Sequence, residues 1–114
     1  MKSRNRHIDL IFRAIADPTR REIFHVLVVA SAALSITQIT EQFDISRQGV
    51  TKHIKTLEEA GLVSITAEGR ERFCTALPKN LRAISVWLSF YDNFWQDALD
   101  RLGDHLDDDN MDSN

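Results

Sequence analysis

The chain has 114 residues, 43% of them hydrophobic, and a net charge of −3 at pH 7. This length suits one domain with a sizeable hydrophobic core, and the single cysteine excludes an internal disulfide framework. No stretch approaches the roughly 20 apolar residues of a membrane span and the N-terminus has no apolar signal-peptide region, so we expect a cytoplasmic protein with no membrane partner.

Two helices are predicted in the first third of the chain. In the first, apolar residues recur at helical spacing: Ile8, Ile11, Phe12 and Ile15. Asp17-Pro18 then supplies an N-cap followed by a proline at the first helical position, which is the pair that starts a helix. The apolar side of this second helix consists of Ile23, Phe24, Leu27 and Val28. His25 lies on the same apolar helix and is expected in the core.

The next two helices are short and follow each other closely. Ser35 and Gln38 form a capping box that opens a helix of about nine residues. "FDIS" is the turn, and Ser46 then caps a second helix that runs to Ala60 and is ended by Gly61. Two short helices joined by a tight turn match a helix-turn-helix, whose second helix enters the DNA major groove.

A hairpin and a long helix complete the chain. Val63 and Ile65 alternate with polar residues, Glu68-Gly69 makes a turn, and the chain returns from Arg70 to Leu77. Pro78 ends the hairpin, and a helix follows over about 79–106. The fold class is therefore mainly α with a small β-hairpin, a winged helix-turn-helix of order α-α-α-α-β-β-α, and we expect it to dimerise through its terminal helices. We expect one domain over residues 1–106 and a disordered acidic tail over 107–114.

The helix Ser46–Ala60 has one apolar and one cationic side. With a step of about 100° per residue, Val50, Ile54 and Leu57 fall on one stripe. The opposite side and its flank carry side chains that reach base edges and phosphates. The cations lie near the N-terminus of the helix and the acids near its C-terminus, which is the reverse of the order that the helix dipole favours. Because this order does not serve stability, we predict a DNA-contacting face. Its candidate residues are Ser46, Arg47, Gln48, Thr51, Lys52, His53 and Lys55.

The predicted wing, Ser64–Leu77, adds two arginines. Arg70 follows the turn, and Arg72 lies two residues on and hence on the same face of the strand. Both can reach flanking phosphates. His53 borders the apolar stripe, so a phosphate contact and a packing role are both open for it. The N-terminal Lys2, Arg4 and Arg6 form either a DNA-touching arm or, as we favour, a solvated tail. Cys74 is expected to fill a strand position rather than act in redox chemistry.

The last helix has more apolar surface than one side can use. Alternating four- and three-residue spacing marks a seam for a partner helix. The seam residues, our candidate dimer interface, are Ile84, Leu88, Tyr91, Trp95, Ala98 and Leu102. Such a helix in a small domain favours dimerisation over a monomer that buries every aromatic residue. The same aromatic residues could also line a pocket for an apolar effector, and the sequence does not separate the two.

Three segments together resemble the ArsR-type winged-helix transcriptional repressors: "AIADPTRREIFHVL", "SITQITEQFDISRQGVTKHIKTLEEAGLV" and "EGRERF". The resemblance covers roughly residues 8–106. It implies a homodimer that binds double-stranded operator DNA and blocks transcription until a signal releases it. In this family the recognition helix falls on Ser46–Ala60 of this chain, and the wing arginines on Arg70 and Arg72. The pair Gln48-Gly49 departs from the family pattern, which leaves the target sequence open.

The sensor residues of the family are missing. Metal-sensing members carry a Cys-x-Cys pair where this chain has "SITQITEQF", and Thr and Gln do not replace thiolates for a soft metal. On the last helix, His105 with Asp104 and Asp108 gives too few ligands for a closed site within one chain. We therefore expect no metal site and no cofactor, and the effector is unknown.

The residues thus predict a sequence-specific DNA-binding transcriptional regulator, while a bacterial source and repression are implied by the resemblance alone. One alternative is a winged-helix protein-interaction module without DNA binding. Another is a metal- or redox-responsive regulator with a site shared across the dimer. No nucleophile–base pair, phosphate-binding loop or metal cluster is present in the sequence, so we do not expect an enzyme.

Overall fold

The computed structural model describes the backbone of residues 2–112 and the side chains of residues 6–104. The chain forms two compact units, Met1–Arg82 and Ala83–Asn114. The sequence predicted one domain over residues 1–106 that includes the last helix, and this assignment stays a prediction. The second unit consists of the last helix, and a single helix has no hydrophobic core of its own.

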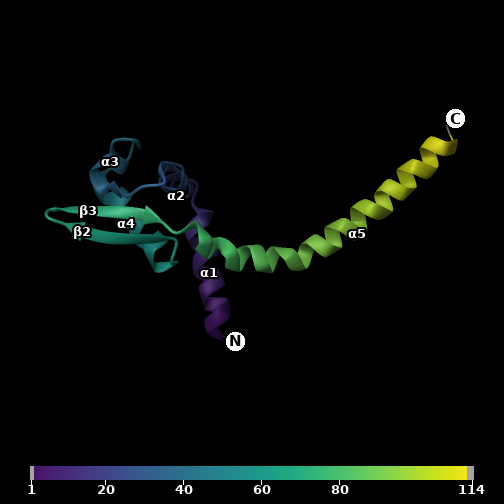
Figure 1. Ribbon diagram of the computed structural model, residues 1–114, viewed down its shortest axis with the longest axis horizontal. Helices are drawn as coiled ribbons and strands as arrows, with labels where there is room; N and C mark the ends of the chain where they lie inside the picture. The colour runs from purple at the N-terminus through teal and green to yellow at the C-terminus, as the bar shows by residue number, and fades with distance from the viewer. Residues whose placement is uncertain (1, 113–114) are drawn as a thin grey trace. The chain divides into compact units, whose positions relative to one another are not determined.

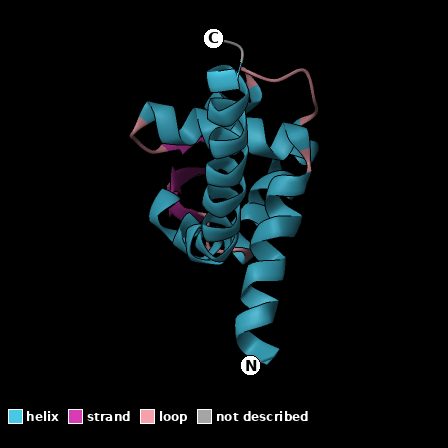
Figure 2. Cartoon of the chain, turned by 90° about the vertical axis from the view of Figure 1, so that its right-hand side faces the viewer, coloured by secondary structure: helices cyan, strands magenta, loops and turns pink. Residues whose placement is uncertain are grey.

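The elements follow one another in the predicted order (Figure 1). They are α1 (Lys2–Ala16), α2 (Pro18–Ala30), β1 (Leu34–Ser35), α3 (Ile36–Thr40), α4 (Arg47–Glu59), β2 (Val63–Glu68), β3 (Glu71–Ala76), the 3-10 turn η1 (Pro78–Leu81) and α5 (Arg82–Asp112). Helices dominate and the strands form one small sheet (Figure 2). The winged helix-turn-helix fold is therefore confirmed, with β1 and η1 as two short elements that were not predicted.

Polar groups of residues 17–21 form hydrogen bonds with the end of α1 and the start of α2. The Asp17 carboxylate caps α2 by accepting a bond from the Arg20 backbone N–H at 2.9 Å, and this bond lowers the pKa of Asp17 from its ordinary value. The Arg20 guanidinium donates to the carbonyl of Arg13 at 2.9 Å, and that of Arg21 donates to the carbonyl of Ile15 at 2.7 Å. Because the last carbonyls of a helix have no partner within it, the two arginines cap the end of α1.

Two expectations about the first two helices are corrected. Lys2, Arg4 and Arg6 belong to α1 rather than to a solvated tail, and the side chains of the first two lie outside the described residues. His25, expected in the core, is exposed. The buried positions of α2 are Ile23, Phe24 and Leu27, and a helical step of about 100° per residue turns His25 away from them.

The helix α3 begins as predicted and ends early. Both bonds of the capping box are present: Gln38 N donates to Ser35 Oγ at 3.0 Å, and Ser35 N donates to Gln38 Oε1 at 2.8 Å. The α-helix stops at Thr40 instead of continuing for about nine residues. Gln42 and Phe43 donate their backbone N–H groups to the carbonyls three residues back, so the helix tightens into the turn.

Both predicted ends of α4 are confirmed. The Ser46 hydroxyl accepts a bond from the backbone N–H three residues on, at 3.0 Å. At the other end Gly61 has φ 77°, and the backbone N–H of Leu62 donates to the Leu57 carbonyl at 2.9 Å. This is the Schellman arrangement, which needs a left-handed residue and therefore favours glycine.

The sheet has the order β1-β3-β2 and is antiparallel. Glu68 pairs with Glu71, so the hairpin loop is Gly69-Arg70 rather than the predicted Glu68-Gly69. Gly69 has φ 63°, and glycine at the first position of a two-residue loop is the preference of a type II′ turn. Arg70 therefore lies at the tip of the wing, and Arg72 lies in β3.

The sheet and the helices of the first unit share one core. Its buried apolar residues are Ile11, Ala14, Ile23, Phe24, Leu27, Ile36, Ile39, Val50, Ile54, Leu57, Ala60, Leu62, Val63 and Cys74. After the sheet, Leu77 N donates to the Leu62 carbonyl at 2.8 Å, and Asn80 Nδ2 donates to the Gly61 carbonyl at 2.6 Å. These two bonds hold the segment around η1 against the end of α4.

The helix α5 extends beyond its predicted end. The sequence predicted a helix to Leu106 and a disordered tail over 107–114, whereas the backbone is helical through Asp112. No proline interrupts the stretch, and Asp and Asn are only moderately unfavourable within a helix. Residues 113 and 114 lie outside the described residues.

Candidate nucleic-acid interface

The two sides of α4 are as different in the structure as in the sequence. Val50, Ile54 and Leu57 are each 0% exposed and fasten the helix to the core. The cations and the amide of the predicted face are exposed, and Thr51 is half-buried. Four of these residues line one shallow hollow of the surface: Arg47, Gln48, Thr51 and Lys52. The fold thus brings most of the predicted α4 site residues together on one accessible surface.

Arg47 is tied to the preceding helix of the motif. Its Nη1 donates to Thr37 Oγ1 on α3 at 2.7 Å. The Thr51 hydroxyl donates back to the Arg47 carbonyl at 2.9 Å. Sequence reasoning did not find Thr37, because the two side chains are ten residues apart and meet only across the turn.

Ser46 and Gly49 shape the N-terminal cap of α4. Ser46 is the N-cap, and a Cβ added at Gly49 would lie 3.3 Å from the Ser46 Oγ. That separation is shorter than usual for such a contact, so a larger residue at position 49 would press on the capping hydroxyl. The capping geometry therefore accounts for a glycine in the first turn of α4, where helix propensity disfavours it.

His53 contacts α2. It is half-buried, and its Nδ1 accepts a bond from Arg20 Nε at 3.3 Å. An Nδ1 that accepts a bond leaves the proton of a neutral imidazole on Nε2. The sequence left a phosphate contact and a packing role open for His53, and this bond supports the packing role. Arg20 also caps α1, so its side chain links α1, α2 and α4.

The wing carries acids as well as its arginines. Arg70 and Arg72 are both exposed. Glu68 and Glu71 face each other at the end of the hairpin, directly before and after the Gly69-Arg70 loop. The two carboxylates reduce the positive potential at the tip, an effect that the count of arginines in the sequence did not include.

Cys74 is fully buried in β3, which lies between β1 and β2. Desolvation, and to a smaller extent the charge of Glu58, raise the pKa of its thiol to about 11. The reactive form of a cysteine is the thiolate. The strand-filling role expected from the sequence therefore agrees with the position of this side chain.

Cys74 should resist alkylation in the folded protein. At pH 8 only about one thiol in 10³ is ionised when the pKa is near 11, and the sulfur has no access to solvent. We expect iodoacetamide at pH 8 to label the native chain at least about 100-fold more slowly than the chain in urea, followed by mass spectrometry. The chain has no second cysteine, so the signal has one source, and rapid labelling of the native chain would refute the assignment.

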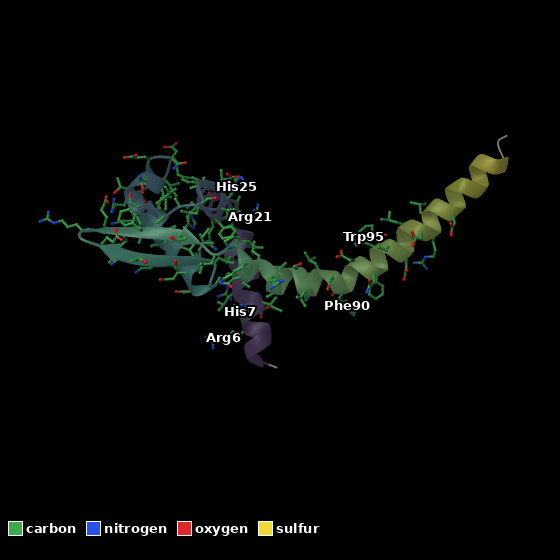
Figure 3. The ribbon with its side chains drawn as sticks, viewed as in Figure 1. Arg6, His7, Arg21, His25, Phe90 and Trp95 are labelled. Atoms are coloured by element: carbon green, nitrogen blue, oxygen red, sulfur yellow. The ribbon has the colours of Figure 1, made fainter. Side chains whose placement is uncertain are left out.

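The large apolar side chains of α5 are exposed. Among the predicted seam residues, Leu88, Tyr91, Trp95 and Leu102 are 46%, 43%, 64% and 53% exposed. Outside the seam, Phe90 lies 5.4 Å from Phe94 between ring centroids. Figure 3 shows Phe90 and Trp95 projecting to different sides of α5. The apolar surface is thus broader than the seam alone.

Among the described residues, no group of three or more His, Cys, Asp or Glu side chains could hold a metal ion. Asp104 is exposed, while the side chains of His105 and Asp108 lie outside the described residues. No helix in the described part of the chain is long and apolar enough to cross a membrane.

The chain is similar to known transcription regulators. A family model for a helix-turn-helix domain matches residues 15–66. The HTH-type transcriptional regulator Rv2034 of Mycobacterium tuberculosis is 34% identical over 91 residues, which cover 80% of each chain. The transcriptional repressor SdpR of Bacillus subtilis is 33% identical over 60 residues, 53% of this chain and 64% of the repressor. The solved structure of an ArsR-like transcriptional regulator from Rhodococcus sp. RHA1 superposes with a TM-score of 0.68 at 28% identity, covering 86% of this chain and 91% of that one.

Proposed function

The chain belongs to the ArsR-type winged helix-turn-helix transcriptional regulators, and from that membership we propose that it is a homodimeric repressor that places α4 in the major groove. The family predicted from the sequence is confirmed, and with it a DNA-binding regulator. The residues that read DNA, the dimer interface and the direction of regulation are the proposed parts.

The exposed side of α4 is the observation that carries the proposal. Its buried stripe fixes which side faces outward, and that side presents Arg47, Gln48, Lys52 and Lys55. These side-chain types contact base edges and phosphates. We assign base reading to Arg47, Gln48 and Thr51, and phosphate contacts to Lys52 and Lys55. Ser46 and His53 support this surface through the cap and the bond from Arg20.

We assign the flanking DNA backbone to the wing. Arg70 at the tip and Arg72 in β3 are exposed. The neighbouring Glu68 and Glu71 disfavour a close approach of the whole tip to phosphate, so the long arginine side chains make the contact. Such contacts carry little sequence information and depend strongly on salt.

The proposed dimer uses α5. The exposed side chains of the seam, among them Leu88, Tyr91 and Trp95, recur at the spacing that pairs helices. A contiguous exposed apolar patch of this kind marks an interface. A two-fold dimer places two α4 helices on half-sites one helical turn, or a multiple of it, apart. Repression is supported by the relative SdpR, which is named a repressor.

The alternatives are less well supported. A winged-helix protein-interaction module would favour an apolar or acidic surface on α4, whereas this surface is cationic. A redox-responsive regulator would need an accessible thiol, whereas Cys74 is buried. The relatives are transcription regulators, and we propose no enzymatic activity.

Binding to the DNA upstream of the protein's own gene tests the proposal. Fluorescence anisotropy with that duplex and with a scrambled duplex, at about 150 mM salt, should show a preference of about 10³ or more for the upstream DNA. Equal and weak binding to both would exclude an autoregulatory operator. In that case the same titration is repeated with promoter fragments from the rest of the genome. Equal and weak binding to all of these fragments would oppose the DNA-reading role of α4.

Arg70→Ala should weaken binding to every duplex by a similar factor, because a phosphate contact is independent of sequence. The slope of log affinity against log salt should fall by about 1. Titrations at several salt concentrations measure both. Gln48→Ala is the matched contrast, because it should narrow the difference between operator and scrambled DNA and leave the salt slope unchanged. If Arg70→Ala instead changed only discrimination, the wing assignment would be wrong.

A further inference from the structure

The bond between Arg47 and Thr37 joins the two helices of the helix-turn-helix at the surface. Arg47 is the first residue of α4, and its Nη1 lies 2.7 Å from the Thr37 Oγ1 of α3. Arginine is exposed here and its long side chain has many rotamers in water. A hydrogen bond to a partner on another helix favours one orientation of the side chain before any DNA is bound.

Thr37 is a rigid partner. Two other residues of the same helix, Ile36 and Ile39, are 4% and 0% exposed, so α3 packs firmly against the core. The capping box of Ser35 and Gln38 secures the start of the same helix. Threonine is β-branched and stiff at its first side-chain torsion. The backbone of Thr37 is therefore fixed by the fold, and its hydroxyl oxygen has only a small number of possible positions.

The bond orients the guanidinium without neutralising it. A guanidinium has five N–H donors in a planar fork, and one of them is used by Thr37, so the others remain available. The threonine hydroxyl is uncharged, so the full positive charge of Arg47 remains. A planar, pre-oriented fork matches the O6 and N7 acceptors that guanine presents in the major groove.

We propose that Thr37 is a positioning residue that holds Arg47 for guanine, so that each operator half-site carries a guanine opposite the first turn of α4. The inference rests on the proposed function of α4. Thr37 lies outside the predicted DNA-reading residues, and it determines specificity through Arg47 rather than by touching a base.

Selection from a randomised double-stranded DNA library tests the inference with the full-length protein. Wild type, Thr37→Val, Thr37→Ser and Thr40→Val are each bound to the library, and the recovered duplexes are sequenced. Valine keeps the shape of threonine and removes the hydroxyl, whereas serine keeps the hydroxyl. Thr40→Val is the matched control, since Thr40 Oγ1 donates to the Ile36 carbonyl of the same helix at 2.7 Å and does not bond Arg47.

We expect wild type, Thr37→Ser and Thr40→Val to recover the same operator with a guanine in each half-site. Thr37→Val should recover the same operator with the preference for that guanine reduced about five-fold or more. In anisotropy titrations of that operator, its slope of log affinity against log salt should equal that of the wild type. Arg47→Lys reaches the same result without altering α3, because a lysine cannot form the bidentate pair. This second variant keeps the test valid if Thr37→Val unfolds.

Two results would overturn the inference. Either Thr37→Val or Arg47→Lys could recover the operator with the wild-type preference at every position. Alternatively, Thr37→Val could weaken all sequences equally and lower the salt slope, which would place Arg47 on phosphate. Failure of the wild type to enrich any sequence is a different outcome, because it removes the proposed function together with the inference.

Discussion

Replacing Leu88 and Trp95 of α5 by Glu is expected to make the protein a monomer and to lower its operator affinity by about 10³. Both residues belong to the proposed seam and are 46% and 64% exposed in the single chain. A pair of carboxylates in a helix–helix seam would be desolvated without partners, at a cost of several kcal/mol. A monomer then binds one half-site and loses the second binding event that the dimer makes intramolecular.

Sedimentation equilibrium measures the first effect and anisotropy with the operator measures the second. The matched control is Asn93→Glu with Gln96→Glu, which adds the same charge to exposed positions of α5 outside the seam. The control should remain dimeric. Persistence of the dimer in the Leu88/Trp95 variant would place the interface elsewhere, and a monomer with full operator affinity would remove the need for a dimer.

Ile54→Ala is expected to destabilise the first unit by about 2–5 kcal/mol, as is usual when a large buried side chain is truncated. Ile54 is 0% exposed at the centre of the inward stripe of α4. Domains of this size have a free energy of unfolding of about 5–15 kcal/mol, so the variant loses a large share of it. Urea denaturation followed by circular dichroism gives the change directly.

The neighbouring Lys55→Ala supplies the contrast, because Lys55 is exposed on the other side of the same helix. Its free energy of unfolding should change by no more than about 0.5 kcal/mol, while its affinity for every duplex falls. The pair separates the packing side of α4 from the reading side. Equal losses of stability in the two variants would contradict the division of the helix into these sides.

Local signals in the sequence predicted α4 well. Ser46, Gly61 and the stripe of Val50, Ile54 and Leu57 all act within a few residues, so capping rules and helical periodicity suffice for them. The hairpin was predicted with its loop shifted by one residue. Glycine can occupy either position of such a loop, and the pairing of the strands decides which one it takes.

Contacts between distant segments could not be predicted. The bond from Arg20 to His53 spans 33 residues and the bond from Arg47 to Thr37 spans ten. Each depends on how the helices pack, and no rule of spacing contains that information. The exposure of His25 was missed for a related reason, because its helix is apolar on average while only one side of it faces the core.

The hairpin has a consequence for the geometry of the operator. Its two strands are six residues long and are joined by a loop of only two residues. Six paired residues extend about 20 Å, which is the length of about six base-pair steps at 3.4 Å each. If α4 and the wing bind DNA as proposed, the backbone contact at the wing tip lies at a fixed distance from the groove that α4 occupies. The length of the hairpin then sets the size of each half-site.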